Sequence, residues 1–217
     1  MIVINMKKYV SEFIGTFSMV FCGTGAMTIN EVTGGQIGHV GIAITWGLIV
    51  MAMIYALGEI SGAHFNPAVT ISFAYVKKFP WKEVPKYISA QVLGALLASG
   101  ILLILFPASE YLGATIPTVA IWRAFILEFL LTYFLMLVII TVSTGSKEIG
   151  VVAGMAIGSV VLLEAMFAGP ITNASMNPAR SIAPALMSGN LEHLWMYITA
   201  PILGAIFAVI TGGYLRK

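Results

Sequence analysis

The tripeptide Asn-Pro-Ala occurs twice in this 217-residue chain, at residues 66–68 and, 111 residues further on, at residues 177–179. Asn is a favoured helix N-cap because its side-chain oxygen accepts a backbone N–H bond, and Pro suits the first helical position, where an N–H lacks a partner anyway. Each tripeptide therefore predicts a helix start, and each lies inside a hydrophobic stretch. Lipid cannot satisfy the first N–H groups of such a helix, so they must be buried in protein or line a watery cavity. The pair indicates a hole through a membrane.

The two Asn side chains could also act on what passes through that hole. If each oxygen caps its own helix, the NH₂ group remains a donor toward the lumen. Two donors at one point would bind the oxygen of a water and turn its protons outward, while two helix N-termini add positive potential. Protons and cations are then disfavoured and neutral molecules pass. The alternative, that Asn66 and Asn177 are ordinary caps of structural helices, leaves their symmetric placement at the midplane of the membrane unexplained.

Composition places the chain in a membrane. Hydrophobic residues make up 59% of it and charged residues 9%, and the mean hydropathy is +0.97. These values are far from those of a soluble domain. The apolar run after Lys7 and Lys8 continues to about residue 27 without a convincing cleavage site, so we interpret it as a first span rather than a signal peptide.

Six apolar runs are long enough to cross a bilayer, and two shorter ones begin at the tripeptides. The short segments, 66–76 and 177–187, would each rise about 16 Å, roughly half the hydrocarbon thickness. The predicted fold class is thus an all-α membrane protein with six transmembrane helices and two re-entrant half-helices. The six expected spans lie near residues 8–30, 40–60, 84–106, 119–142, 149–168 and 194–214.

The two halves of the chain repeat one another. The pattern Glu-Phe-x-x-Thr occurs at residues 12–16 and again at 128–132, ahead of its tripeptide in each half. Because each half contains three spans, the second copy must enter the membrane inverted, which brings the two half-helices to the midplane from opposite faces. We expect one channel domain over residues 1–217, built from inverted repeats of about 1–110 and 111–217.

Positive charge predicts the orientation. Nine of the eleven Lys and Arg residues fall on one side of this topology, and the positive-inside rule makes that side cytoplasmic, with both termini inside the cell. Arg123 lies near the outer start of the fourth span, and only Arg180, directly after the second tripeptide, needs a special explanation. The nine are Lys7, Lys8, Lys77, Lys78, Lys82, Lys86, Lys147, Arg216 and Lys217.

The segments SGAHFNPAVT at residues 61–70 and SMNPARS at residues 175–181 resemble the two signature loops of the aquaporins, the major intrinsic proteins. The resemblance covers the whole chain. Within the family, residues 169–176 and 195–201 look most like the nodulin-like intrinsic proteins and their bacterial relatives. The resemblance implies a homotetramer in the cell membrane, with a pore in every protomer.

The resemblance also implies a selectivity filter at Trp46, Ala165, Ala174 and Arg180. Arg180 would repel cations and hold the oxygen atoms of a solute. Trp46 would form a flat apolar wall opposite, whereas by itself it would be interpreted as a lipid-facing or interfacial aromatic. At the two filter positions where water-selective relatives carry a histidine and a small polar residue, this chain has Ala165 and Ala174, which are smaller. We therefore expect a wide, amphipathic aperture.

Glu12 and Glu128 would be expensive to bury in membrane helices without partners. Their equivalent positions in the two halves suggest that each carboxylate accepts N–H bonds from a re-entrant loop, as the resemblance implies. A proton relay is the alternative, but neither has an ionisable partner that repeats with it. His64 is expected to position the first loop and line the cytoplasmic vestibule, while His39 and His193 are predicted to be surface loop residues.

The roles of Glu59 and Glu164 stay open. One helical step is about 100°, so Glu164 should not share the pore-facing direction of Ala165. It would instead face a neighbouring helix or the axis of the tetramer.

The leading hypothesis is a passive channel for water and small uncharged solutes. A secondary transporter, which inverted repeats also build, would need a coupling-ion site, and the chain contains no Asp. An ion channel conflicts with Arg180 and the two helix dipoles. The sequence gives no reason to expect an enzyme, because it shows no nucleophile with its base, no metal cluster and no phosphate-binding loop. We expect no cofactor, no metal and no nucleic-acid partner. Water, glycerol, urea, ammonia, hydrogen peroxide and undissociated arsenous or boric acid all fit.

Overall fold

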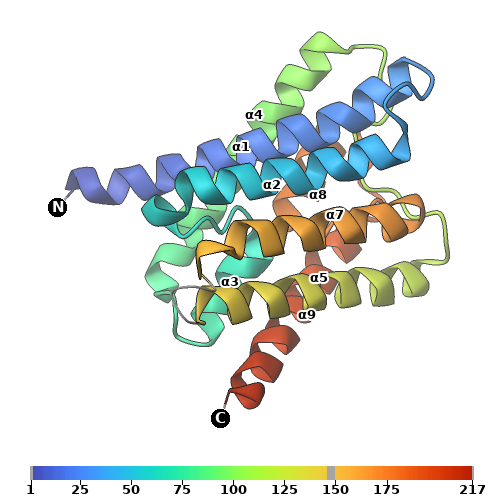
Figure 1. Ribbon diagram of the computed structural model, residues 1–217. Helices are drawn as coiled ribbons and strands as arrows, with labels where there is room; N and C mark the ends of the chain where they lie inside the picture. Colours follow the sequence, from blue (N-terminus) through green and yellow to red (C-terminus); the bar gives the residue numbers. More distant parts are fainter. Residues whose placement is uncertain (1, 146–149, 217) are drawn as a thin grey trace.

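The computed structural model describes residues 2–145 and 150–216, and these residues form helices and connecting loops without a strand (Figure 1). Lys147 and Lys217, used above for the orientation, lie outside this part. The helices are α1 (Ile2–Val32), α2 (Gly38–Ser61), α3 (Pro67–Tyr75), α4 (Val84–Leu105), α5 (Ile121–Ser143), α7 (Ala153–Thr172), α8 (Pro178–Ser188) and α9 (Leu194–Leu215), and a short 3₁₀ turn, η1 (Trp81–Glu83), precedes α4.

Six of these helices are long and apolar enough to cross a membrane, namely α1, α2, α4, α5, α7 and α9. The two others, α3 and α8, are the half-helices that the tripeptides predict. Both begin with Pro at the first position and have Asn66 or Asn177 as N-cap. In Figure 1 the N-terminus lies at the left, at the end of α1, and the C-terminus lies at the bottom, at the end of α9.

The helices contact one another in an order that repeats in the two halves. In the first half α1 packs on α2 and α4, and in the second α5 packs on α7 and α9. The half-helices cross over, because α8 packs on α4 and α3 packs on α9. Helices α2 and α7 pack on each other. This symmetry defines the inverted repeat of the fold.

Two glycines allow the tightest helix crossings. A Cβ atom placed on Gly94 of α4 would lie 2.3 Å from the carbonyl oxygen of Phe13 in α1. A Cβ on Gly204 of α9 would lie 2.2 Å from the carbonyl oxygen of Phe129 in α5. Real atoms do not approach so closely, so each crossing depends on a missing side chain. The two crossings bring Glu12 and Glu128, one residue earlier, to equivalent places in the bundle.

The fifth span differs from its prediction. It was expected near residues 149–168, but α7 continues through Pro170 to Thr172. Pro170 has no N–H to bond the carbonyl of Met166, four residues earlier. The imidazole Nε2 of His39 lies 2.5 Å from that carbonyl oxygen and satisfies it. The prediction that His39 is a loop residue is therefore wrong, since it is the second residue of α2, although its side chain remains exposed.

The other spans lie within a few residues of their predicted limits, except that α1 begins earlier, at Ile2. These limits follow from local signals that the sequence displays. Gly62 is the C-cap of α2 and Gly189 that of α8, and both have positive φ, of 86° and 82°. Glycine adopts this left-handed conformation without the steric cost that other residues incur.

Candidate functional site

Two cavities lie along the inside of the bundle. The first, of about 150 Å³, is lined by α2, α5, α7 and the two re-entrant loops, and its lining includes Asn66, Asn177 and Arg180. The second, of about 420 Å³, is lined by residues of α1, α2 and α7 and of the loop between α4 and α5. Trp46 and Ala165 belong to both linings. These two residues therefore stand at the boundary between the cavities.

The two tripeptides meet through their Asn side chains. Oδ1 of Asn66 accepts the N–H of Ala68 at 2.9 Å, and Oδ1 of Asn177 accepts that of Ala179 at 3.0 Å. Nδ2 of Asn66 donates to a carbonyl of the second loop at 2.8 Å, and Nδ2 of Asn177 to one of the first loop at 2.9 Å. An amide nitrogen carries two N–H groups. One N–H of each Asn is thus used between the loops. The second N–H of Asn177 has only a long contact, 4.0 Å from Nδ2 to the sulfur of Met19, so both Asn side chains can still offer one N–H to the cavity.

The loops before the half-helices are strained at equivalent positions. Ala63 and Phe65 have φ values of 49° and 48°, and Ala174 and Met176 have values of 41° and 56°. None of the four is glycine, so each left-handed residue costs about 1–3 kcal/mol. The surrounding structure must compensate for this strain.

Two buried carboxylates hold the strained loops. Glu12 accepts the N–H of His64 at 2.9 Å and that of Phe65 at 2.7 Å. Glu128 does the same for residues 175 and 176, at 2.9 and 3.0 Å. Both glutamates are fully buried. Hydrogen bonds to a charged acceptor are stronger than neutral ones, and these four are the pairs that the repeat leads us to expect.

His64 lies in the first loop and lines the first cavity. Its Nδ1 is 3.1 Å from the hydroxyl of Thr70, and its ring stacks on that of Phe73 with centroids 5.0 Å apart. The side chain is thereby fixed between the loop and the half-helix that follows. This arrangement suits a residue that positions the loop.

The four predicted filter residues all line the first cavity. Arg180 is 1% exposed, and its Nη1 donates to the carbonyl of Gly113 at 2.7 Å. The central carbon of its guanidinium lies 4.8 Å from the centre of the Trp46 ring, a cation–π contact. The expectation that Trp46 lies opposite Arg180 is therefore wrong. The two side chains are in direct contact.

Helix α1 supplies two contacts that the sequence did not single out. The sulfur of Met27 lies 3.1 Å from Nη2 of Arg180, and that of Met19 lies 4.0 Å from Nδ2 of Asn177. Residues eight apart share a helix face, and Glu12 lies on nearly the same face. That periodicity was available in the sequence. The carbonyl of Gly113, in the loop between α4 and α5, had no comparable signal.

Glu164 and Glu59 lie apart from the cavities. Glu164 is 2% exposed, so it faces the interior of the protomer and not the axis of a tetramer. Its Oε2 has no hydrogen-bond partner among the described residues. Glu59 is exposed near the end of α2.

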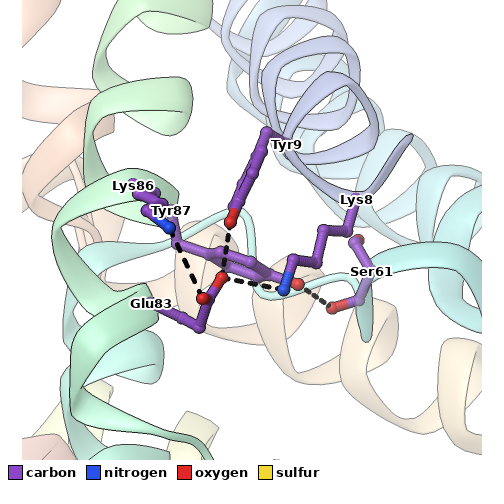
Figure 2. Close-up of polar contacts among 6 residues, drawn as sticks. All are labelled: Lys8, Tyr9, Ser61, Glu83, Lys86 and Tyr87. Atoms are coloured by element: carbon purple, nitrogen blue, oxygen red, sulfur yellow. Dashed lines mark hydrogen bonds and ion pairs between the residues drawn. The ribbon is translucent and has the colours of Figure 1, made fainter. Parts of the chain in front are cut away.

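A polar cluster ties α1 to α4 at the end of the bundle where the chain begins (Figure 2). Glu83 accepts a hydrogen bond from the hydroxyl of Tyr9 at 2.5 Å, and its carboxylate lies 2.7 Å from Nζ of Lys8 and 3.6 Å from Nζ of Lys86. The cluster lies outside the cavity lining.

Next to this cluster, a tyrosine holds the start of the first re-entrant loop. The hydroxyl of Tyr87 donates to the carbonyl of Ser61 at 2.8 Å, as Figure 2 shows. The second half has the same contact, because the hydroxyl of Tyr197 donates to the carbonyl of Thr172 at 2.8 Å. Both tyrosines are buried. Each re-entrant loop is thus held by a tyrosine where it begins and by a carboxylate near its tripeptide.

Comparison with known proteins identifies the class to which this architecture belongs. A helical membrane bundle with paired half-helices is shared with the aquaglyceroporin from Plasmodium falciparum, whose X-ray structure matches with a TM-score of 0.86 and 26% identity over 94% of each chain. The major intrinsic protein family matches residues 2–211. The chain belongs to that family.

Among its relatives are plant proteins of the nodulin-like type. Aquaporin NIP1-1 from Oryza sativa subsp. japonica is 48% identical over 202 residues, which cover 93% of this chain and 71% of the relative. Nodulin-26 from Glycine max is 46% identical over 202 residues, covering 93% of this chain and 74% of that protein. The chain is most like this branch of the family, as the sequence predicts.

Proposed function

We propose that the protein is a passive membrane channel for water and small uncharged solutes such as glycerol and undissociated metalloid acids, and that it excludes protons and ions. The observation that carries the proposal is the meeting of Asn66 and Asn177 in the cavity lining, each the cap of a half-helix and each with one amide N–H to spare. The aquaporin relatives and the aquaglyceroporin fold support it.

In this mechanism, a solute oxygen accepts the two spare N–H groups where the half-helices meet. The N-terminal ends of α3 and α8 add positive potential at the same place, because their first N–H groups point toward it. A water held in this way has its own protons directed outward, so it cannot pass a proton between neighbours along a continuous chain. Cations are repelled by the same potential.

The filter of Trp46, Ala165, Ala174 and Arg180 selects by size and polarity. Arg180 offers N–H donors and a fixed charge, and the Trp46 ring beside it offers an apolar surface. The two alanines leave room for a molecule larger than water. A short polyol or a trihydroxy acid has hydroxyl groups for the donors and a neutral body for the apolar wall, which suits this lining.

The chain acts as a single channel domain with repeats of about 1–110 and 111–217, in the cell membrane, with both termini cytoplasmic. The described basic residues on the termini side, Lys77, Lys78 and Lys82 among them, support this orientation. Large apolar side chains such as Trp122, Leu163 and Phe167 are exposed on the protomer, at 60%, 60% and 56%. They suit contact with lipid and with three further copies in a homotetramer.

Purified protein in proteoliposomes tests the proposal. Osmotic swelling should report water and glycerol permeation with a low activation energy, and a boric acid gradient should collapse faster than in empty vesicles. A pH-sensitive dye should meanwhile show no proton current. Uptake that saturates and depends on an ion gradient, or ohmic current that matches the solute flux, would contradict a passive channel.

A further inference from the structure

We propose that Gly23 determines the specificity of the filter, because its missing side chain provides the space in which the Trp46 ring lies. In this view α1, which contributes no predicted filter residue, decides how far the ring extends into the aperture. The inference rests on the proposed function in one respect, that solutes pass the boundary formed by Trp46 and Ala165.

The contact between Gly23 and Trp46 is closer than any side chain would permit. A Cβ atom on Gly23 would lie 2.4 Å from Cδ2, 2.4 Å from Cε2 and 2.5 Å from Cε3 of the indole. These atoms belong to the six-membered ring of the indole and not to its flexible attachment. Trp46 is itself 7% exposed. The ring therefore lies flat against the backbone of α1, with no room behind it for a methyl group.

Arg180 also contacts the ring. The guanidinium of Arg180 lies 4.8 Å from the ring centre, and its Nη2 contacts the sulfur of Met27, one helical turn beyond Gly23 on α1. The ring thus contacts both α1 and Arg180, and Trp46 lines both cavities. A methyl group on Gly23 would overlap the ring, so the ring must move, and its contact with Arg180 and its place in both cavity linings must change with it.

The inverted repeat supplies an internal comparison. Glu12 and Glu128 are 116 residues apart, and the same interval leads from Gly23 to Ile139. In the second half Ile139 lines the first cavity with its own side chain. The first half has glycine at the equivalent place, and the indole fills the volume.

The residue equivalent to Trp46 in the second half supports the same comparison: a large side chain at one position goes with a small one at its neighbour. The two tripeptides are 111 residues apart, and this interval leads from Trp46 on α2 to Ile157 on α7, which also lines the first cavity. Two isoleucines in one half thus correspond to a glycine and a tryptophan in the other. The large flat ring is possible only because its neighbour on α1 has no side chain.

Gly23→Ala should therefore narrow the filter without altering any residue that faces the solute. One added methyl group in a packed pocket changes discrimination by about tenfold or more. We expect the ratio of glycerol flux to water flux in proteoliposomes to fall by about tenfold, because glycerol needs the wider aperture. An unchanged ratio in folded protein would overturn the proposal.

Gly25→Ala is the matched control on the same helix. A Cβ on Gly25 would meet only Cδ2 of Leu102, at 3.4 Å, which is an ordinary contact. This variant should keep the flux ratio of the parent. If an alanine merely weakened the packing of α1, the water flux and the glycerol flux would fall together. The ratio of the two fluxes would then stay the same, so a change in the ratio reports the filter and not a loss of stability.

A double-mutant cycle with Trp46→Phe separates a direct clash from a remote effect. Phenylalanine lacks the fused ring whose atoms lie against Gly23, so adding Gly23→Ala to Trp46→Phe should change the flux ratio by no more than about twofold. An undiminished tenfold fall in that background would overturn the proposal, since the alanine would then act through some other group.

Fluorescence tests the position of the ring without any transport. Trp81, Trp122 and Trp195 are exposed, at 56%, 60% and 54%, and their replacement by Phe leaves Trp46 as the single emitter. Gly23→Ala in that chain should shift the emission, because the contact of the ring with Arg180 changes, whereas Gly25→Ala should not. Unchanged emission would overturn the proposal. If the parent carried neither water nor glycerol, the proposed function would fail while this measurement still decided the inference.

Discussion

At the residue scale, most polar groups of the candidate pore are committed to the protein, and few remain for a solute. Each tripeptide Asn uses its oxygen as a cap and one N–H for the opposite loop. Arg180 donates to Gly113 and contacts the sulfur of Met27, and its Nε has no partner among the described residues. A solute that brings oxygen acceptors can accept from the remaining amide N–H groups of Asn66 and Asn177, whereas a cation cannot. The lining therefore favours neutral, hydroxyl-bearing molecules.

Arg180→Val should open the channel to charge. A unit charge about 4 Å from another interacts with roughly 4 kcal/mol at an effective dielectric constant of 20, and the substitution removes this repulsion. We expect proton or cation leak in proteoliposomes to rise by at least about tenfold. A correctly assembled variant that stays tight to protons would show that the two half-helix dipoles suffice.

Ala165→Val tests the width of the filter at a helical position. Ala174 is a less suitable site for added bulk, because its φ of 41° would strain a larger side chain. The valine methyl groups should lower glycerol flux by about tenfold relative to water flux. Equal loss of both fluxes, or none, would mean that Ala165 does not lie in the constriction.

At the element scale, the re-entrant loops require support because their backbone is strained. Positive φ values at equivalent places in both loops have no glycine to relieve them. A carboxylate from α1 or α5 and a tyrosine hydroxyl from α4 or α9 hold each loop. The long helices thus act as a frame that forces a short segment into a conformation it would not adopt alone.

Glu12→Gln should weaken that frame. The amide end of glutamine has donors where the carboxylate accepted N–H bonds, so one loop donor loses its partner, at a cost of about 1–3 kcal/mol in the free energy of unfolding. The melting temperature of Glu12→Gln in detergent should fall, while its preference among solutes should stay unchanged. Glu128→Gln should show the same two effects. A stable but inactive Glu12→Gln, with flux in the parent that follows a proton gradient, would favour a proton relay instead.

Gly94→Ala should disrupt the crossing of α1 and α4. The new methyl group would lie 2.3 Å from a backbone carbonyl oxygen, which cannot rotate away as a side chain can. Overpacking of this kind costs about 1–3 kcal/mol or more, and we expect a clearly lower melting temperature. Gly100→Ala on the same helix is the control, because its methyl group would meet only Met187 Cε, at 4.0 Å. Similar melting temperatures for Gly94→Ala and Gly100→Ala would contradict the claim that the crossing of α1 and α4 depends on the missing side chain at Gly94.

At the scale of the whole molecule, six spans return the chain to the side on which it begins. The same side carries the exposed basic residues of the loop after α3 and the polar cluster of Figure 2. The opposite side carries the wider cavity and the loop that binds Arg180. The two ends of the pore therefore differ in charge and in shape.

Cysteine labelling tests the predicted orientation. In a Cys22→Ala chain, Glu192→Cys lies after α8 and should react with a membrane-impermeant maleimide on intact cells, because its side chain is 87% exposed. Lys78→Cys lies after α3 and should react only after the cells are opened. The reverse pattern would place the termini outside.

Much of the fold followed from signals that are local in the chain. Hydropathy gave the spans, because each helix must itself satisfy its backbone in lipid, and the Asn-Pro pairs gave the half-helix starts, because a cap acts on the next two or three residues. The repeat of Glu12 at Glu128 indicated equivalent places in two halves. The end of α7 was mispredicted because the satisfaction of the Met166 carbonyl depends on His39, 127 residues away.

The sequence alone therefore determined the membrane class, the inverted repeat and the residue types at the candidate filter. Only the tertiary structure decided that Trp46 contacts Arg180 and that each tripeptide Asn donates a hydrogen bond to the opposite loop. It also decided that the indole of Trp46 packs against the backbone of α1 at Gly23. The physical reason is sequence separation. The bond from Asn177 to the first loop spans 112 residues, and such a contact exists only where helix packing brings distant segments within a few ångströms.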